Sequence, residues 1–405
     1  MNLTELNPTF GANLRKMKPA FLSAIVFATC ISGCKSTSTV DAPTPQSTMR
    51  PQTIALLVTP KMLPNFDRPD DAIRQFFLRY SPLTSKAAKV IVIFSVGNSD
   101  HILGYGGVDH WDDQIDWART TDFIPISART LTYKQIDSIV RAFRIQAAEL
   151  GFPLSIYEQI DSGNEFTATN TFKYVEHPEC TANKWGMFDI RGRLLSDRRS
   201  YATAPDGISD GTLCGDFLVD QVADYIRDLG FDGILYDNQL GTRGRWHAGD
   251  GPGYSLEETD AIRSFLSRSR VALGDKGLMW FDSYNNTQVE KETFSFPFDA
   301  YQDFDYLIAS GFCVMTEPTP YTDDLDSKLA IKGHAEILAT LDYVDPWYSY
   351  NSKDDYPVCS SRLEGTAIQY RDRIDGIMLF ANDETGALVP ASFIDSFAAR
   401  FFVDQ

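Results

Sequence analysis

The sequence predicts an α/β fold, a single (β/α)8 barrel with a long insertion between its third and fourth strands. Eight short, mainly apolar runs recur between residues 53 and 383, and longer segments with a helical apolar period separate several of them. Apolar strands joined by helices indicate a parallel sheet covered on both faces, and eight such units favour a closed barrel over an open doubly wound sheet. No Gly-x-Gly-x-x-Gly motif follows an early strand, which disfavours a dinucleotide-binding fold.

The predicted elements alternate along the chain, and several of the helical segments end in glycine, a common helix stop. The predicted strands are residues 53–60, 89–98, 153–161, 233–240, 278–286, 312–320, 339–347 and 374–383. The predicted helices are residues 133–151, 215–230, 256–273, 327–338 and 391–403. Because the connection from the third strand to the fourth is unusually long, we expect it to form a lid or insertion.

Residues 1–33 have the layout of an export signal. Basic residues precede an apolar run over residues 20–32 that is too short to span a membrane comfortably. The following tetrapeptide, Ile-Ser-Gly-Cys, resembles the lipobox of bacterial lipoproteins. That resemblance implies lipidation at Cys34 and anchoring to the bacterial outer membrane, on its periplasmic face or at the cell surface. An ordinary cleaved signal with an incidental Cys34 is the alternative, and Met17 is an alternative start.

The remainder of the chain divides into a tether and one large domain. Residues 34–50 are rich in Ser, Thr and Pro and read as a flexible tether, whereas residues 51–405 hold the predicted barrel. The formal net charge of −18 would repel phosphate backbones, so nucleic acid is not an expected partner. Solubility is the simplest explanation of this charge.

Cysteine usage agrees with an exported protein. Apart from Cys30 in the signal and Cys34, four cysteines remain, an even number for an oxidising compartment. Cys180 and Cys214 bracket a loop-like stretch, so we expect them to form a disulfide. A pairing of the other two cysteines, at positions 313 and 359, is less favoured because the first is expected inside a strand.

Acidic residues follow most of the predicted strands. Barrel active sites lie at the C-terminal ends of the strands, so these carboxylates are expected to gather in one cleft. Histidines are scattered and no zinc or calcium-loop spacing occurs, whereas glycoside hydrolysis needs only two carboxylates with separate roles and no cofactor. We therefore expect neither metal nor cofactor. The acids are Glu158, Asp161, Asp237, Asp282, Glu317, Asp342 and Asp383.

The stretch "LGFDGILYDNQLG", residues 229–241, resembles the fourth barrel strand of TIM-barrel glycoside hydrolases. It is most similar to the dextranase and cycloisomaltooligosaccharide glucanotransferase family, glycoside hydrolase family 66. That resemblance implies a retaining polysaccharide or oligosaccharide hydrolase with Asp237 as nucleophile and, by strand order, Glu317 as acid/base. The α-1,4-polygalactosaminidase family, with a similar Asp-Gly-apolar-Asp strand, is a second resemblance. Family 66 enzymes carry β-sandwich domains that this chain has no room to hold.

Further polar and aromatic residues at predicted strand ends are candidates for contact with a carbohydrate substrate. Because side chains alternate along a strand, at most one of Glu158 and Asp161 points into the barrel. Trp280 and Tyr236 are expected in the core, and Asp232 in a turn at the start of the fourth strand. The candidate substrate-binding residues are Glu158, Asp282, Tyr284, Trp246, Asp342, Trp347 and Arg243.

Other interpretations remain open. Asp237 can be a structural acid bonded to loop amides, Glu317 can face solvent, and Asp282 and Asp342 can serve in structural hydrogen bonds. A non-catalytic glycan-binding lipoprotein would keep the barrel without chemistry, since a barrel fold alone does not establish activity. A metal-dependent hydrolase that uses the acid ring is a third possibility.

Overall fold

The structure is a computed structural model of the whole chain, whose contacts divide it into two units, Met1–Ser47 and Thr48–Gln405. It describes residues 52–96, 102, 105–116, 130–161, 187–188, 194–196, 214–237, 266–281, 303–309, 325–326, 328–330, 332–341, 343, 356–383 and 385–403. The predicted signal, its lipidation site at Cys34 and the tether lie outside these residues. Within them, no helix is both long and apolar enough to cross a membrane.

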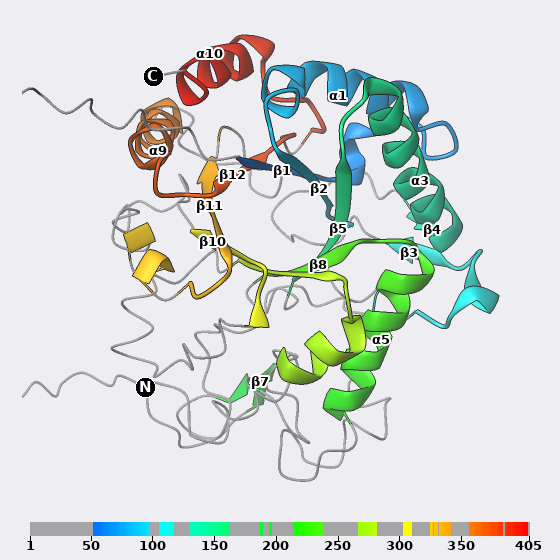
Figure 1. Cartoon of the computed structure of the whole chain (residues 1–405). Helices are drawn as coiled ribbons and strands as arrows, with labels where there is room; N and C mark the ends of the chain where they lie inside the picture. The colour runs from blue at the N-terminus through cyan, green and yellow to red at the C-terminus, as the bar shows by residue number, and fades with distance from the viewer. Residues whose placement is uncertain are drawn as a thin grey trace, which may run out of the picture. The chain divides into compact units, whose positions relative to one another are not determined.

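Eight parallel strands close into a barrel, which confirms the predicted fold (Figure 1). Around the barrel, each strand pairs with its two neighbours in the order β1-β12-β11-β10-β9-β8-β5-β2. The strands are β1 (Thr53–Val58), β2 (Lys89–Phe94), β5 (Leu154–Asp161), β8 (Gly233–Asp237), β9 (Gly277–Phe281), β10 (Tyr306–Ala309), β11 (Glu336–Leu341) and β12 (Gly376–Phe380).

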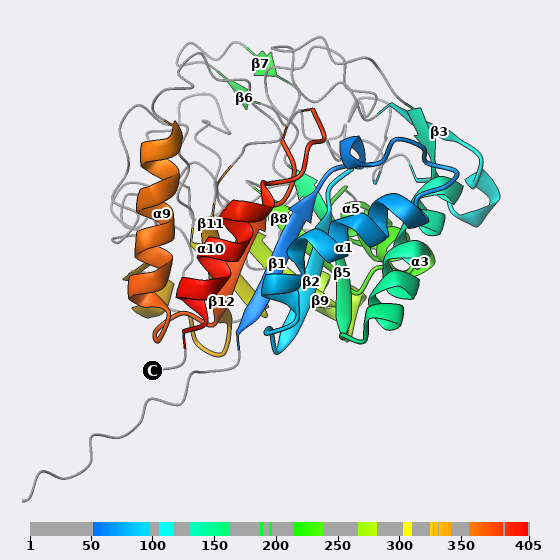
Figure 2. The same cartoon turned by 90° about the horizontal axis from the view of Figure 1, so that it is seen from above.

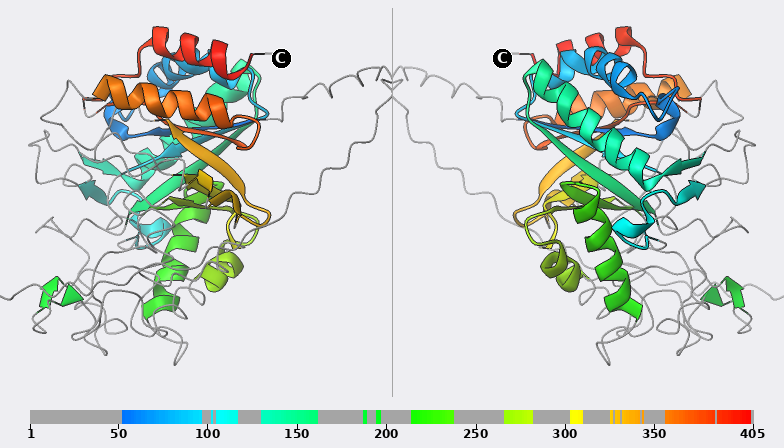
Figure 3. Two further views of the ribbon diagram at one scale, coloured as in Figure 1. Left: turned by 90° about the vertical axis from the view of Figure 1, so that its left-hand side faces the viewer. Right: turned by 90° about the vertical axis from the view of Figure 1, so that its right-hand side faces the viewer.

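Helices surround the strands, and α1 lies beside α10 on the outside of the barrel (Figure 2). The side views show α3 and α9 in the same outer layer (Figure 3). The predicted helix 133–151 is α3, which begins with a capping box between Thr132 and Gln135 and ends at Gly151, whose φ is +79°. Helices within the described residues include α1 (Asp70–Thr84), α3 (Tyr133–Leu150), α5 (Cys214–Asp228), α9 (Tyr356–Tyr370) and α10 (Ala391–Phe401), with the short 3-10 helices η1 (Pro60–Met62) and η2 (Val108–His110). Residues 266–273, within the predicted helix 256–273, are also helical.

Two small antiparallel sheets accompany the barrel. One pairs β3 (Gln114–Asp116) with β4 (Thr130–Thr132), between the second and third barrel strands. The other pairs β6 (Met187–Phe188) with β7 (Leu194–Ser196) and lies within the long connection from β5 to β8. The predicted insertion between the third and fourth barrel strands is therefore confirmed.

Two predicted elements were placed wrongly. The sixth barrel strand is β10 (Tyr306–Ala309), not residues 312–320, because four buried apolar residues directly after Asp305 take the place in the sheet. The predicted helix 327–338 extends too far, since Gly333 adopts a φ of +56° and the strand β11 begins at Glu336. The argument from strand order that placed Glu317 at the end of the sixth strand is thereby removed.

The alternation of side chains divides the core into two clusters. Tyr236 and Trp280 are fully buried in the cluster between strands and helices, which confirms their predicted core positions. The barrel interior holds the other cluster: Ala55, Leu57, Ile91, Ile93, Tyr157, Leu235, Met279, Phe281, Tyr306, Ile308, Leu338, Met378 and Phe380.

Asp232, the residue before β8, ties that strand to β5. Its backbone N–H donates to the carbonyl of Ile156 at 2.7 Å, and its carboxylate accepts the N–H of the same Ile156 at 2.9 Å. Arg144 of α3 donates to this carboxylate at 3.0 Å. The predicted turn residue therefore joins two strands and a helix.

The same bridge recurs before β10 and before β12. In each case an Asp carboxylate accepts a backbone N–H from the preceding strand and a bond from a basic side chain, all at 2.8–2.9 Å. The position before β2 is Ala88, whose N–H donates to Gln52 without any carboxylate. The two further bridges join Asp305 to Leu278 and Arg270, and Asp375 to Ile337 and Lys332.

The change Asp375→Ala tests how much such a bridge contributes to the free energy of unfolding. It removes the acceptor for the Ile337 N–H and the partner of Lys332, so we expect the free energy of unfolding to fall by about 1–3 kcal/mol in urea titrations. Glu149→Ala is the control, because the exposed pair of Glu149 with Arg74 is expected to contribute less than about 1 kcal/mol. Equal losses in both variants would contradict the bridge.

Candidate active site

Two aspartates occupy paired positions at the C-terminal edge of the barrel. Asp237 is the last residue of β8, and its Cα partners are Asp161 on β5 and Phe281 on β9. Asp237 lies two positions beyond Leu235, whose side chain packs in the barrel interior. Neighbouring strands are about 4.8 Å apart, so the backbone brings two carboxylate-bearing residues to adjacent positions. The sequence places Asp161 among the acids but assigns it no role.

Buried polar residues lie at the same end of the barrel as this pair. Asn382 follows β12 and donates to Thr59 Oγ1 at 2.9 Å, while its Oδ1 accepts the Thr59 N–H at 2.9 Å. Ser95 follows β2 and is fully buried, as are Thr59 and Asn382, and Gln159 on β5 is 3% exposed. The barrel interior therefore changes from apolar to polar at the end where barrel enzymes hold their active sites.

Glu158, a predicted substrate-binding residue, faces the helices instead. Its carboxylate accepts the backbone N–H groups of Val96 at 3.2 Å and Gln159 at 3.1 Å, and the Tyr225 hydroxyl at 3.1 Å. Val96 and Tyr225 belong to the cluster outside the barrel. Burial, together with the nearby charge of Glu158, raises the pKa of Tyr225 well above its usual value. These contacts are typical of a structural carboxylate. They agree with the alternation of side chains along β5, which lets at most one of Glu158 and Asp161 point into the barrel.

Most other predicted site residues lie outside the described part of the chain, so their predictions stay predictions. Cys214 begins α5, but its predicted partner lies outside as well. Among the described residues, no group of three or more His, Cys, Asp or Glu side chains is arranged to hold a metal ion. The predicted residues outside the description are Glu317, Asp282, Tyr284, Trp246, Asp342, Trp347, Arg243 and Cys180.

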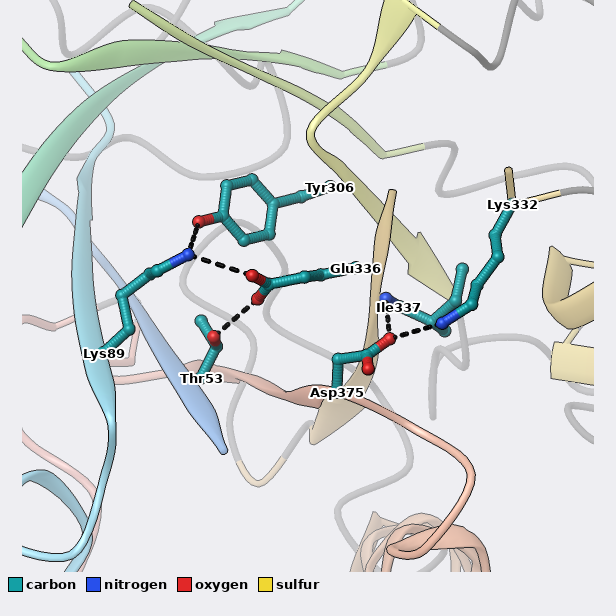
Figure 4. A network of polar contacts seen from close by, with 7 residues as sticks. All are labelled: Thr53, Lys89, Tyr306, Lys332, Glu336, Ile337 and Asp375. Carbon is teal, nitrogen blue, oxygen red and sulfur yellow. Dashed lines mark hydrogen bonds and ion pairs between the residues drawn. The ribbon is translucent and has the colours of Figure 1, made fainter. Parts of the chain in front are cut away.

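The opposite end of the barrel carries a charged network around an open cavity of about 560 Å³. Figure 4 shows Lys89 between Tyr306 and Glu336, with Thr53 on the far side of the carboxylate. The Lys89 ammonium donates to the Tyr306 hydroxyl at 2.6 Å and to Glu336 Oε1 at 2.9 Å, and Thr53 donates to Glu336 Oε2 at 2.6 Å. Sequence reasoning missed this network, because its members stand at the starts of four different strands.

The electrostatics of this network do not suit acid/base chemistry near neutral pH. Burial alone would lower the pKa of Lys89, but its hydrogen bonds to Tyr306 and Glu336 outweigh burial and raise it. Burial raises the pKa of Tyr306 as well. Lys89 therefore stays an ammonium and Tyr306 a neutral phenol, whereas a general base needs a pKa near the working pH.

Tyr157 lines the cavity, and its ring leaves no space for a side chain at Gly233 and Gly277. A Cβ on Gly277 would collide with the Tyr157 hydroxyl, and a Cβ on Gly233 would stand 2.7 Å from its ring. The tyrosine ring thus crosses the first residues of β8 and β9, where only glycine leaves room. Packing of this kind at the N-terminal end of a barrel is typical of a stabilising role.

No family model matches the chain, and no curated protein matches it. Solved structures that resemble it include an endo-1,4-β-mannanase from Rhizomucor miehei (12% identity, 87% of this chain and 92% of that chain, TM-score 0.46). A chitinase from Bacteroides thetaiotaomicron (10%, 88% and 97%, TM-score 0.42) and morphinone reductase (13%, 82% and 82%, TM-score 0.40) are also similar. The similar structures include both hydrolases and a reductase, so they assign no activity to this chain. The barrel fold is established by the strand order in the structure itself.

Alkaline unfolding tests the Lys89 network. A raised pKa in the folded state means that stabilisation by Lys89 is complete below about pH 10.4, the usual lysine pKa, and is lost as the pH rises through the folded value. We expect the free energy of unfolding to fall above that pH, and to fall less steeply in Lys89→Met. The exposed Lys134 provides the control variant Lys134→Met, which should keep the wild-type slope. Parallel slopes in all three proteins would refute the network's contribution.

Proposed function

We propose that this chain is a glycoside hydrolase that cleaves a polysaccharide or oligosaccharide at the C-terminal end of its barrel. The observation that carries the proposal is the pairing of Asp161 with Asp237 at adjacent register positions on that edge. Hydrolysis of a glycosidic bond uses two carboxyl groups and needs no metal or cofactor, so acidic residues gathered at this edge support the proposal. The resemblance of residues 229–241 to the fourth strand of glycoside hydrolases supports the same assignment.

In the proposed mechanism, Asp237 is the nucleophile and Glu317 the acid/base. The Asp237 carboxylate attacks the anomeric carbon while the glycosidic C–O bond breaks and Glu317 protonates the leaving oxygen. Glu317 then takes a proton from the water that hydrolyses the glycosyl ester, which restores both residues. The configuration is retained because two displacements occur at the same carbon.

Asp161 is the alternative acid/base, since the correction of the sixth strand leaves Glu317 without its argument from strand order. Asp161 is the Cα partner of Asp237 in the register of β5 with β8, which makes it the candidate that the described residues supply. Replacing each acid separately distinguishes the two assignments. The true acid/base variant, Glu317→Gln or Asp161→Asn, should lose about 10²- to 10⁴-fold in rate.

The test of the function is release of reducing ends by the purified full chain from α- and β-glucans, galactans, amino-sugar polymers and uronate polymers. We expect one polymer to be cleaved, and Asp237→Ala to abolish cleavage because the glycosyl ester cannot form. Glu149→Ala, on the outer surface, should cleave at the wild-type rate. Binding of a glycan without any cleavage would contradict the hydrolase and leave a glycan-binding protein.

We also propose that Cys34 is lipidated and holds the protein at the bacterial outer membrane, with a Cys180–Cys214 disulfide formed after export. The order of features in residues 20–34 supports this localisation. In cells, Cys34→Ala should move the protein from the membrane to the soluble fraction, and a non-reducing digest should contain the linked cysteine peptides. Membrane association that survives Cys34→Ala would contradict the lipid anchor.

A further inference from the structure

Ser95, the first residue after β2, has a buried hydroxyl that makes no hydrogen bond among the described residues. Its side chain is fully buried. Ile91 and Ile93 of the same strand pack in the barrel interior, and Ser95 continues their alternation. A hydroxyl buried without a partner destabilises a folded chain, so its presence calls for an explanation.

Two polar residues at the same end of the barrel, Thr59 and Asn382, hydrogen-bond each other. They do so twice, both times at 2.9 Å. The backbone of Ser95 is held as well, because its N–H donates to the carbonyl of Val58 at 2.8 Å. The backbone at Ser95 is therefore fixed, and it is the side-chain hydroxyl that makes no hydrogen bond within the described part of the chain.

The register places Ser95 close to the aspartate pair. Phe94 on β2 is the Cα partner of Glu158 on β5, so the next residue, Ser95, stands level with Gln159. Asp161 follows two positions further along β5, beside Asp237 on β8. Ser95 thus lies on β2, next to β5, two residues deeper in the barrel than Asp161, and β5 separates it from Asp237 of β8.

We propose that the Ser95 hydroxyl binds the substrate, through a hydrogen bond to a hydroxyl group of the sugar unit held beside Asp161 and Asp237. A sugar hydroxyl both donates and accepts, so it satisfies a serine hydroxyl in either direction. Nucleophilic chemistry is not the role assigned, because no described basic group bonds Oγ to activate it. The identity of the ligand rests on the proposed function; the need for a partner rests on the geometry.

The variant Ser95→Ala tests this role in the full chain, with the polymer that the wild-type protein cleaves or binds as the probe. We expect KM, or Kd where nothing is cleaved, to rise about two- to tenfold, the equivalent of one lost neutral hydrogen bond. The Tm should stay equal to that of the wild type or rise, because an unpaired buried hydroxyl is removed. Affinity and stability therefore change in opposite senses.

Thr53→Val is the matched control. It removes a hydroxyl from the opposite end of the barrel, where Thr53 donates to Glu336 at 2.6 Å. Loss of that bond should lower the Tm and leave KM or Kd unchanged. A structural hydroxyl thus gives the reverse of the result expected for Ser95.

The outcomes separate this inference from the proposed function. Cleavage by Ser95→Ala with wild-type KM, or a Tm below that of the wild type, overturns the role of Ser95 and leaves the hydrolase standing. Binding without cleavage that weakens in Ser95→Ala overturns the hydrolase and supports Ser95. No binding of any of the polymers by the wild-type protein overturns both.

Discussion

The register of the barrel depends on a carboxylate that bridges two strands and a helix at the start of β8. Asp232 exchanges two hydrogen bonds with Ile156 of β5, one through its backbone and one through its side chain. A shift of one residue between parallel strands would exchange the inward and outward faces. Five residues after Asp232, the same register sets Asp237 beside Asp161. An interaction at one end of the barrel therefore positions the residues at the other.

The two ends of the barrel have different chemical characters. At the N-terminal end, carboxylates are paired with Arg144, Arg270, Lys332 and Lys89, and the polar groups of this network satisfy one another. At the C-terminal end, the interior turns polar, and the Ser95 hydroxyl makes no hydrogen bond within the described part of the chain. Satisfied groups stabilise the fold, whereas a buried hydroxyl without a hydrogen bond needs an explanation. The proposed binding end thus differs from the N-terminal network, whose members bond one another.

The sequence was sufficient for the barrel but not for every strand. Continuous apolar runs marked β1, β2 and β12 clearly, because parallel strands are buried on both faces. For β10, only four residues form the strand, and the longer apolar run after it drew the prediction to residues 312–320. Asp232 was assigned to the start of its strand, and the structure adds that it bonds Ile156 and Arg144.

The sequence predicts a site at the ends of the strands, but it does not predict which way each acidic side chain faces. Glu158 and Asp237 look alike in the sequence, since each is an acid at the end of an apolar run. Both faces of these strands are apolar, so the sequence does not show whether the odd-numbered or the even-numbered side chains point into the barrel. The position of Glu158 against α5 could therefore not be predicted. The isolation of Ser95 is equally invisible in sequence, because it depends on which groups from other strands lie nearby.

The central claim is that carbohydrate binds at the C-terminal end of the barrel and that the charged N-terminal cavity serves stability. A crystal structure of the Asp237→Asn variant, soaked with an oligosaccharide of the polymer that the wild-type protein cleaves, tests it most directly. The account predicts a sugar beside Asp161 and residue 237, with one of its hydroxyl groups bonded to Ser95 Oγ. A sugar bound instead in the cavity between Lys89, Tyr157 and Tyr306 would contradict the account.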